Sequence, residues 1–283
     1  MAENILENIY YLGPDGSNAH NAMLQFLKTN TIEVKNHYPQ KSIRTALETA
    51  EKDYSSICVL PIENSIEGIV RETIDNLVRL NSKRLKIQGE ITLPIKHLLL
   101  STGKEKSKIK KVISHPQALS QCSRFLHENF PDVEIKEVSS TSYAAQKIAS
   151  LQDDTLAALA NETCAKIFNL NILSDDINDE PDNKTRFYIL SGTELPKEQN
   201  GKTAIILSVK NVSGALCEVL KIFAKHDINL SYIDSRPSRR KLGEYLFFME
   251  MDGYETDYKI ITALEEIMSF VDFFRVLGSF QKF

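Results

Sequence analysis

The chain has 283 residues, of which 42% are hydrophobic and 25% charged, and its formal net charge is −4. This length predicts about two domains, with enough apolar material for a sizeable core. Because a surface that binds nucleic acid is normally basic, the acidic balance argues against a nucleic-acid partner.

The cysteines and the N-terminus indicate a compartment. Cys58, Cys122, Cys164 and Cys217 are far apart and form no C-x-x-C pair, so we expect no zinc site and buried thiols in a reducing cytoplasm. The first residues, "MAENILENIYYLG", lack the basic start and long apolar stretch of a secretory leader. No window reaches 18 apolar residues, so we expect neither a membrane span nor a membrane partner.

Short β-rich runs alternate with helical periods through the first two thirds of the chain. Within 116–129, for example, apolar residues recur at three- and four-residue spacing, as in an amphipathic helix. Strands that alternate with helices predict a mostly parallel α/β sheet. The predicted strands are 9–12, 56–62, 111–115, 135–139, 155–160 and 187–190, and the predicted helices are 18–29, a segment ending near 80, 116–129, 143–150 and 161–169.

The last third of the chain has a different rhythm. Residues 191–202, "SGTELPKEQNGK", are rich in Gly, Pro and charge, which is typical of a linker. After them the order strand, helix, strand, strand, helix, strand predicts an α+β sandwich of the βαββαβ type. The predicted elements are 203–209, 214–226, 229–235, 244–251, 255–269 and 273–280.

Four polar loops each follow a predicted strand and precede a predicted helix. In a parallel sheet such junctions meet at the carboxyl edge, where ligands bind. Helix N-termini offer free N–H groups and partial positive charge, so the edge suits a small anion, and more than one carboxylate. Ser, Asn and Thr are also ordinary helix caps, which is the alternative for each loop taken alone. The loops are 13–17, 63–65, 114–117 and 140–142.

The stretch "DNKTRFYIL" (182–190) places Thr185, Arg186 and Phe187 at the start of a short apolar strand. Each of these residues could instead have a structural role. Arg186 could form an ion pair with the acidic run 175–182, and Phe187 could be part of the hydrophobic core. Thr185 could simply be a β-branched residue that starts the strand. His115, in the loop 114–117, could likewise be a hydrogen-bonded structural histidine and not a functional one.

The motifs "YLGPDG", "PIENSIEG", "SHPQALSQC" and "NKTRF", in this order, resemble those of prephenate dehydratase. The later segments "SGALCEVLKIFAKHDINLSYIDSRPS" and "EYLFFMEM" resemble the ACT regulatory domain fused to that enzyme. The resemblance covers about residues 7–281. It implies an α/β catalytic domain at 7–190 with two lobes like a type II periplasmic binding protein, the second lobe at about 101–175. A linker at 191–202 and a ferredoxin-like ACT domain at 203–281 follow.

The resemblance also implies a reaction, in which prephenate loses carbon dioxide and its ring hydroxyl to give phenylpyruvate, a step of L-phenylalanine biosynthesis. Aromatisation drives the step, so no cofactor or metal is expected. Thr185 matches the family's essential threonine and would hydrogen-bond the leaving hydroxyl. Arg186 would pair with a substrate carboxylate and Phe187 would pack beside the ring. The other implied substrate-binding residues are Asn64, Ser65, Gly68, Ser114, His115 and Gln117.

Two details of the resemblance stay open. Glu63 could either face the substrate or have a structural role, and the two are weighed equally. A carboxylate that faces a dianionic substrate costs energy unless it is protonated or paired. The first motif departs from the family in Ser17-Asn18-Ala19, which keeps a hydroxyl but lacks the usual aromatic ring.

The resemblance implies regulation by L-phenylalanine bound between two ACT domains, and hence a homodimer or homotetramer. The N–H groups at Gly214 would meet the effector's carboxylate. Asp234 stands where the family has Glu, and Ser213 stands where it has Pro. These two departures are expected to alter the affinity for the effector. The implied effector-binding residues are Asn211, Gly214, Ala215, Leu216, Asp234, Ser235, Arg236 and Pro237.

Two other functions remain as alternatives. Arogenate dehydratase performs the same chemistry on the aminated substrate, and a non-catalytic sensor would use the two lobes only to bind a ligand. A fused chorismate mutase is disfavoured, because the first predicted strand begins near Ile9.

Overall fold

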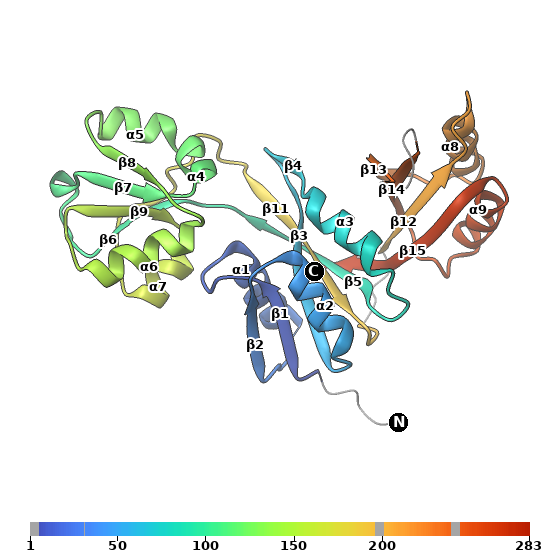
Figure 1. The fold of residues 1–283 in the computed structure, drawn as a ribbon, viewed down its shortest axis with the longest axis horizontal. Coiled ribbons are helices and arrows are strands. Elements are labelled where there is room, and N and C mark those ends of the chain that lie inside the picture. Colours follow the sequence, from blue (N-terminus) through green and yellow to red (C-terminus); the bar gives the residue numbers. More distant parts are fainter. Residues whose placement is uncertain (1–5, 31, 196–200, 239–243) are drawn as a thin grey trace.

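The computed structural model describes residues 6–30, 32–195, 201–238 and 244–283. Figure 1 shows three bodies in a row: a first lobe in the middle, a second lobe at one end and a C-terminal domain at the other. No helix among the described residues is long and apolar enough to cross a membrane.

The first lobe is a mixed sheet with helices on both faces. Strand β1 lies parallel to β2 and β3, whereas β11 lies antiparallel to β3 and β5. The short β4 (Gly68–Ile69) pairs with the end of β3. The elements are β1 (Asn8–Leu12), α1 (Asn18–Asn30), β2 (Asn36–Gln40), α2 (Ile43–Lys52), β3 (Ser56–Asn64), α3 (Arg71–Leu80), β5 (Lys86–Pro94) and β11 (Lys184–Ser191).

The second lobe is a five-stranded sheet in the order β10-β6-β9-β7-β8. Helices α6 and α7 share one core with the sheet, and α4 and α5 share the core on its other face. The elements are β6 (Leu98–Ser101), a 3₁₀ turn (Lys106–Lys108), β7 (Lys111–Ser114), α4 (Pro116–Gln121), α5 (Ser123–Asn129), β8 (Glu134–Glu137), α6 (Thr141–Leu151), β9 (Leu156–Ala160), α7 (Glu162–Phe168) and β10 (Asn171–Ser174).

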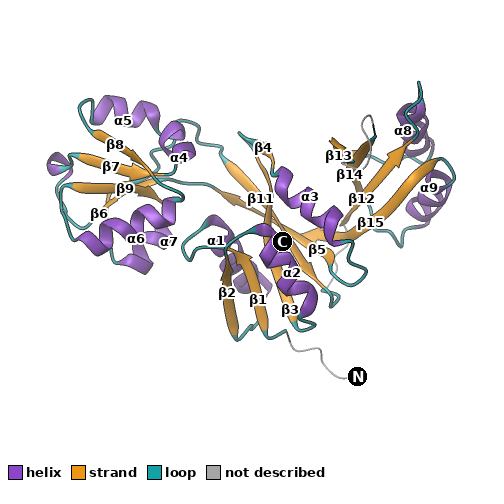
Figure 2. Ribbon diagram, in the orientation of Figure 1, coloured by secondary structure: helices purple, strands orange, loops and turns teal. Residues whose placement is uncertain are grey.

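The C-terminal domain has the predicted βαββαβ order, with α8 and α9 packed on the sheet face turned away from the first lobe (Figure 2). Its strand β15 continues past the domain and pairs with β5, so the two sheets form one ten-stranded sheet. The elements are β12 (Gly201–Val209), α8 (Ala215–Lys225), β13 (Leu230–Pro237), β14 (Tyr245–Asp252), α9 (Tyr258–Met268) and β15 (Val271–Lys282).

The first lobe and the C-terminal domain also share a core. Tyr188 of β11 packs edge-on against Phe280 of β15, with ring centroids 5.4 Å apart. Ile206 and Phe248 of the C-terminal domain belong to the same buried cluster. The C-terminal domain is therefore packed against the first lobe through apolar side chains as well as through the sheet.

The α/β class is confirmed, but several sequence predictions were wrong in detail. The sheets are mixed, because β11 returns from the second lobe in the opposite direction to β3. The single helix expected at 116–129 is two helices that meet at Cys122. Cys217 is exposed, while the other three cysteines are buried and all four are free thiols. Residues 196–200 of the expected linker lie outside the described residues.

Candidate active site

A polar pocket of about 670 Å³ lies between the two lobes. Its walls come from the loop after β1, from the ends of β3 and β11, and from the first residues of α4 and α6. Ser17, Asn18 and Ala19, the residues of the altered first motif, all line it. The lobes therefore meet in the way that the strand–helix junctions predict.

Thr185 and Asn64 form the polar centre of the pocket's first-lobe wall. They lie opposite each other on β11 and β3, and the Asn64 Nδ2 amide donates to Thr185 Oγ1 over 2.8 Å. The backbone N–H groups of Ile66 and Glu67 donate to Asn64 Oδ1, which fixes the orientation of the amide. Since Thr185 Oγ1 accepts this bond, its own proton is left to donate into the pocket.

A chain of amides extends from this pair to the second lobe. Asn64 Nδ2 also donates to Asn183 Oδ1 over 2.8 Å, and Asn183 Nδ2 donates to Gln121 Oε1 over 3.1 Å. His97 Nε2 lies 3.2 Å from the same Gln121 oxygen. Because an amide oxygen only accepts, we assign the proton of neutral His97 to Nε2. Asn64, which donates to Thr185, is thus connected through Asn183 to Gln121 of the second lobe.

His97 makes the stability of the folded protein depend on pH. Burial lowers its pKa, and the hydrogen bond to Gln121 offsets this only in part. Below about pH 6.5 the unfolded chain takes up a proton that the folded chain excludes. The free energy of unfolding therefore decreases as the pH is lowered. We expect the melting temperature to fall less between pH 7 and 5.5 in His97→Gln than in the wild type. His127→Gln, at an exposed histidine of α5, is the control, and an equal fall in all three proteins would contradict the assignment.

Six of the nine predicted catalytic and substrate-binding residues line the pocket. His115 caps α4, its Nδ1 accepting from the Gln117 N–H over 3.2 Å. Phe187 is almost fully buried in the first-lobe core and also borders the pocket. The six residues are Asn64, Gly68, His115, Gln117, Thr185 and Phe187.

Ser65 and Ser114, two of the predicted substrate-binding residues, do not line the pocket. The Ser65 hydroxyl accepts from the Lys184 N–H over 2.9 Å and so fastens the turn after β3 to β11. Ser114 is fully buried and donates to the Leu159 carbonyl over 2.7 Å. Both hydroxyls therefore join neighbouring segments of the chain.

Arg186, which was predicted to pair with a substrate carboxylate, does not line the pocket. Side chains alternate along a strand, so Arg186 points to the face of β11 opposite Thr185 and Phe187. Its guanidinium contacts the carboxylates of Glu63, Glu90 and Glu250, none of which belongs to the acidic run 175–182. Glu63 accordingly has the structural role that stood as its alternative.

Sequence reasoning missed several pocket residues, among them Lys41, His97, Gln121 and Asn183. Two of them offered a signal, since Gln121 lies within "SHPQALSQC" and Asn183 begins "NKTRF". Lys41 precedes the cap of α2, a helix for which no prediction was made. Among the described residues that line the pocket it is the one Lys or Arg.

Six of the eight predicted effector residues line one of two separate cavities. Asn211, Gly214, Ala215 and Leu216 line a cavity of about 290 Å³ with the rings of Tyr245 and Phe247. Gly214 has φ +84°, and a Cβ there would meet nothing within 4 Å, so its backbone is open to a ligand.

Arg236 and Pro237 line a separate cavity of about 400 Å³ beside α3. Arg236 lies 3.5 Å from Asp234 and 3.7 Å from Asp75 of α3. Ser235 lies on the same strand, β13. Within one chain, therefore, the two halves of the expected effector site do not meet.

Two α/β lobes around one polar pocket, followed by a βαββαβ domain packed on the catalytic sheet, define a two-lobed small-molecule enzyme with an attached regulatory unit. The family model for prephenate dehydratase matches residues 9–194, and that for the ACT domain matches residues 203–267. The chain belongs to the prephenate dehydratase family of enzymes and carries a C-terminal ACT domain.

Similar proteins support this assignment. The prephenate dehydratase of Methanocaldococcus jannaschii is 38% identical over 280 residues, which cover 97% of this chain and 98% of that protein. The bifunctional chorismate mutase/prephenate dehydratase of Aquifex aeolicus is 38% identical over 275 residues, which cover 97% of this chain and 73% of that one. Among solved structures, prephenate dehydratase from Arthrobacter aurescens in complex with L-Phe has a TM-score of 0.86 at 32% identity and covers 97% of this chain and 90% of that one.

Proposed function

We propose that residues 7–190 convert prephenate to phenylpyruvate, with Thr185 as hydrogen-bond donor to the leaving hydroxyl. As the ring–carboxylate bond breaks, its electron pair aromatises the ring and the C–O bond breaks on the opposite carbon. The products are carbon dioxide, phenylpyruvate and hydroxide, which becomes water with one proton. The observation that carries this proposal is the Asn64 amide on Thr185 Oγ1, because it directs the threonine proton into the pocket.

The pocket also provides for the substrate's negative charge. The first turn of α6 contributes Thr141 and Ser142 to the lining, and its free N–H groups carry partial positive charge. Lys41 adds a full positive charge on the first-lobe side. With Arg186 engaged elsewhere, we assign Lys41 to a substrate carboxylate.

Lys41→Ala is expected to raise KM for prephenate about tenfold, with kcat within about twofold, because a charge-assisted hydrogen bond contributes about 1.5–3 kcal/mol. Steady-state kinetics at low ionic strength measure both constants. Lys35→Ala, which removes an exposed lysine paired with Glu7, is the matched control. A KM equal to that of the control would remove Lys41 from substrate binding.

We further propose that residues 203–281 bind L-phenylalanine and reduce turnover. The effector's carboxylate would meet the N–H groups at the start of α8, and its ring would pack on Tyr245 and Phe247. Since Asp234–Pro237 lie outside this cavity, a second copy of the chain would supply them, in a homodimer or homotetramer. The free thiols are consistent with a reducing cytoplasm as the compartment.

One assay tests the proposed function. Purified protein is mixed with prephenate at neutral pH, phenylpyruvate is followed by absorbance, and the assay is repeated with L-phenylalanine and with arogenate as substrate. Turnover of prephenate that L-phenylalanine reduces is the expected result. Turnover of arogenate alone would change the substrate, and binding of either without turnover would favour the sensor.

A further inference from the structure

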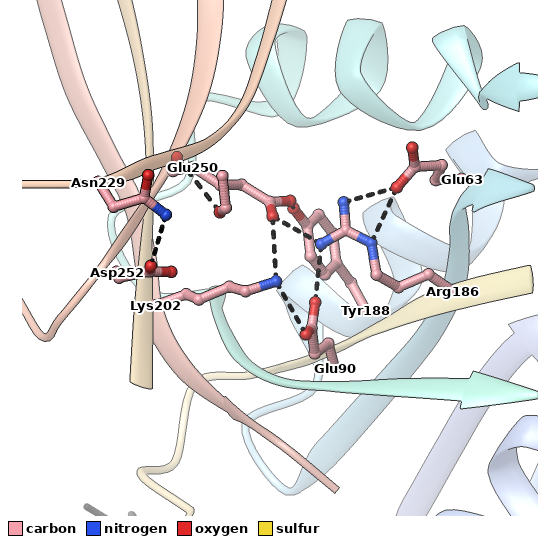
Figure 3. A network of polar contacts seen from close by, with 9 residues as sticks. Glu63, Glu90, Arg186, Tyr188, Lys202, Asn229, Glu250 and Asp252 are labelled. Carbon is pink, nitrogen blue, oxygen red and sulfur yellow. Dashed lines mark hydrogen bonds and ion pairs between the residues drawn. The ribbon is translucent and has the colours of Figure 1, made fainter. Parts of the chain in front are cut away.

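Arg186 is the centre of a buried group of ion pairs on the face of β11 opposite the pocket (Figure 3). Its Nη1 lies 2.6 Å from Glu250 Oε2 and 2.7 Å from Glu90 Oε2, and its Nη2 lies 3.1 Å from Glu63 Oε2. Burial opposes the charge, but the neighbouring carboxylates of Glu250 and Glu90 outweigh it and raise the pKa of Arg186 above its ordinary value. The guanidinium is therefore charged and held on three sides.

Two members of the group come from the C-terminal domain. Glu250 lies on β14 and also accepts from the Tyr188 hydroxyl, and Lys202 lies on β12, 3.1 Å from Glu90 and 3.7 Å from Glu250. The side chains of Glu250 and Glu90 are only 1% and 3% exposed. We call Glu63, Glu90, Arg186, Tyr188, Lys202 and Glu250 the Arg186 cluster.

The Arg186 cluster joins directly to the reacting groups through the backbone. Arg186 is the next residue after Thr185, and Glu63 is the residue before Asn64. The register pairs Thr185 with Asn64 and Arg186 with Glu63. The hydrogen-bonded pair in the pocket and the ion pair on the opposite face are therefore consecutive cross-strand pairs of β11 and β3. A shift of Arg186 toward or away from the C-terminal domain must therefore move Thr185.

The strands that bring Glu250 and Lys202 also line the expected effector cavity. Phe247, three residues before Glu250 on β14, and Val209, at the far end of β12 from Lys202, both line it. A buried charge that loses its partner is strongly disfavoured, so a movement of β12 and β14 is opposed until the ion pairs can exchange partners. The cluster is thus a continuous set of buried ion pairs between the strands that line the effector cavity and β11.

We infer that Glu250 is a positioning residue for Thr185, and that the Arg186 cluster couples the ACT domain to the active site. The inference rests on the proposed function, since it concerns the same threonine and the same effector. Glu250 touches no substrate. It acts through Arg186, whose backbone continues into Thr185.

The first test replaces Glu250 by Gln, which keeps the shape and removes the charge. We expect kcat for prephenate to fall about tenfold or more, since small displacements of a reacting group are costly, while KM stays within about twofold. The fold-inhibition by saturating L-phenylalanine should also fall at least about threefold, although calorimetry still detects its binding. Glu266→Gln, which removes a carboxylate of α9 that pairs with Lys225 of α8 and with His226, is the control and should behave as wild type.

The second test does not depend on turnover. Amide hydrogen exchange in residues 183–191 should be about tenfold faster in Glu250→Gln than in the wild type, with no change in β9 of the second lobe. If the wild type converts no prephenate, the proposed function fails, and the exchange of β11 alone decides on the coupling. Wild-type exchange in β11, wild-type kcat or a rise in KM alone would overturn the inference.

A double-mutant cycle separates coupling from general loss of stability. If Glu250 acts through Arg186, adding Glu250→Gln to Arg186→Gln should change kcat by less than about twofold. Lys202→Gln, at a side chain that is 29% exposed, serves if Glu250→Gln folds poorly, and should show the same split of kcat and KM at smaller amplitude. Full additivity of the two substitutions would contradict the inference.

Discussion

Thr185→Ala is expected to lower kcat for prephenate about 10³-fold while the protein still binds prephenate with nearly its original affinity. Hydroxide is a poor leaving group, and negative charge develops on its oxygen as the C–O bond breaks. The hydrogen bond that Thr185 donates to this oxygen is therefore strongest in the transition state and weak in the ground state. Folding should change little, because Asn64 Nδ2 keeps two other acceptors, Asn183 Oδ1 and the Lys184 carbonyl.

Steady-state kinetics and calorimetric titration of the inactive variant with prephenate measure the two quantities. Thr185→Val keeps the shape of the side chain and should be as inactive as Thr185→Ala, whereas Thr185→Ser keeps the hydroxyl and should retain much of the activity. If Thr185→Val turns prephenate over at the wild-type rate, Thr185 has no part in the chemistry. A raised KM with unchanged kcat would make it a binding residue instead.

Gly278→Ala is expected to destabilise the protein by about 3–5 kcal/mol, from backbone strain and a steric clash together. Gly278 has φ +154°, a region that side chains avoid, and lies where β15 passes across β5. A Cβ there would stand 2.2 Å from the carbonyl oxygen and 2.6 Å from the nitrogen of Ile87. Because both contacts are with backbone, one strand would have to move.

Denaturant unfolding of the variant measures this cost, and Gly214→Ala is the matched control. Gly214 also has a positive φ, +84°, but a Cβ there would meet nothing within 4 Å, so only strain of about 1–2 kcal/mol is expected. We also expect weaker L-phenylalanine inhibition in Gly278→Ala, since β15 joins the C-terminal domain to β5. Equal losses of stability at the two glycines would show that the close approach to Ile87 does not exist.

Much of this protein could be predicted from its sequence because the signals are local. Periodicity and turn residues indicated an α/β domain and a βαββαβ domain, and the resemblance to prephenate dehydratase implied that the α/β part has two lobes. The strand–helix junctions indicated a polar pocket, and the motifs around Asn64, His115 and Thr185 indicated which junctions line it. The strands, helices and junctions depend on residues that are close together in the chain, so their spacing carries them, whereas the lobes and the site residues came from the resemblance.

Tertiary structure alone decided where Arg186 points and what it contacts. Alternation along a strand determines that Thr185 and Arg186 face opposite sides, but not which side borders the pocket. The carboxylates that surround the guanidinium are distant in the chain, at separations of 123, 96 and 64 residues for Glu63, Glu90 and Glu250. Contacts of this kind depend on how β3, β5 and β14 are brought beside β11, and no local pattern in the sequence records that arrangement.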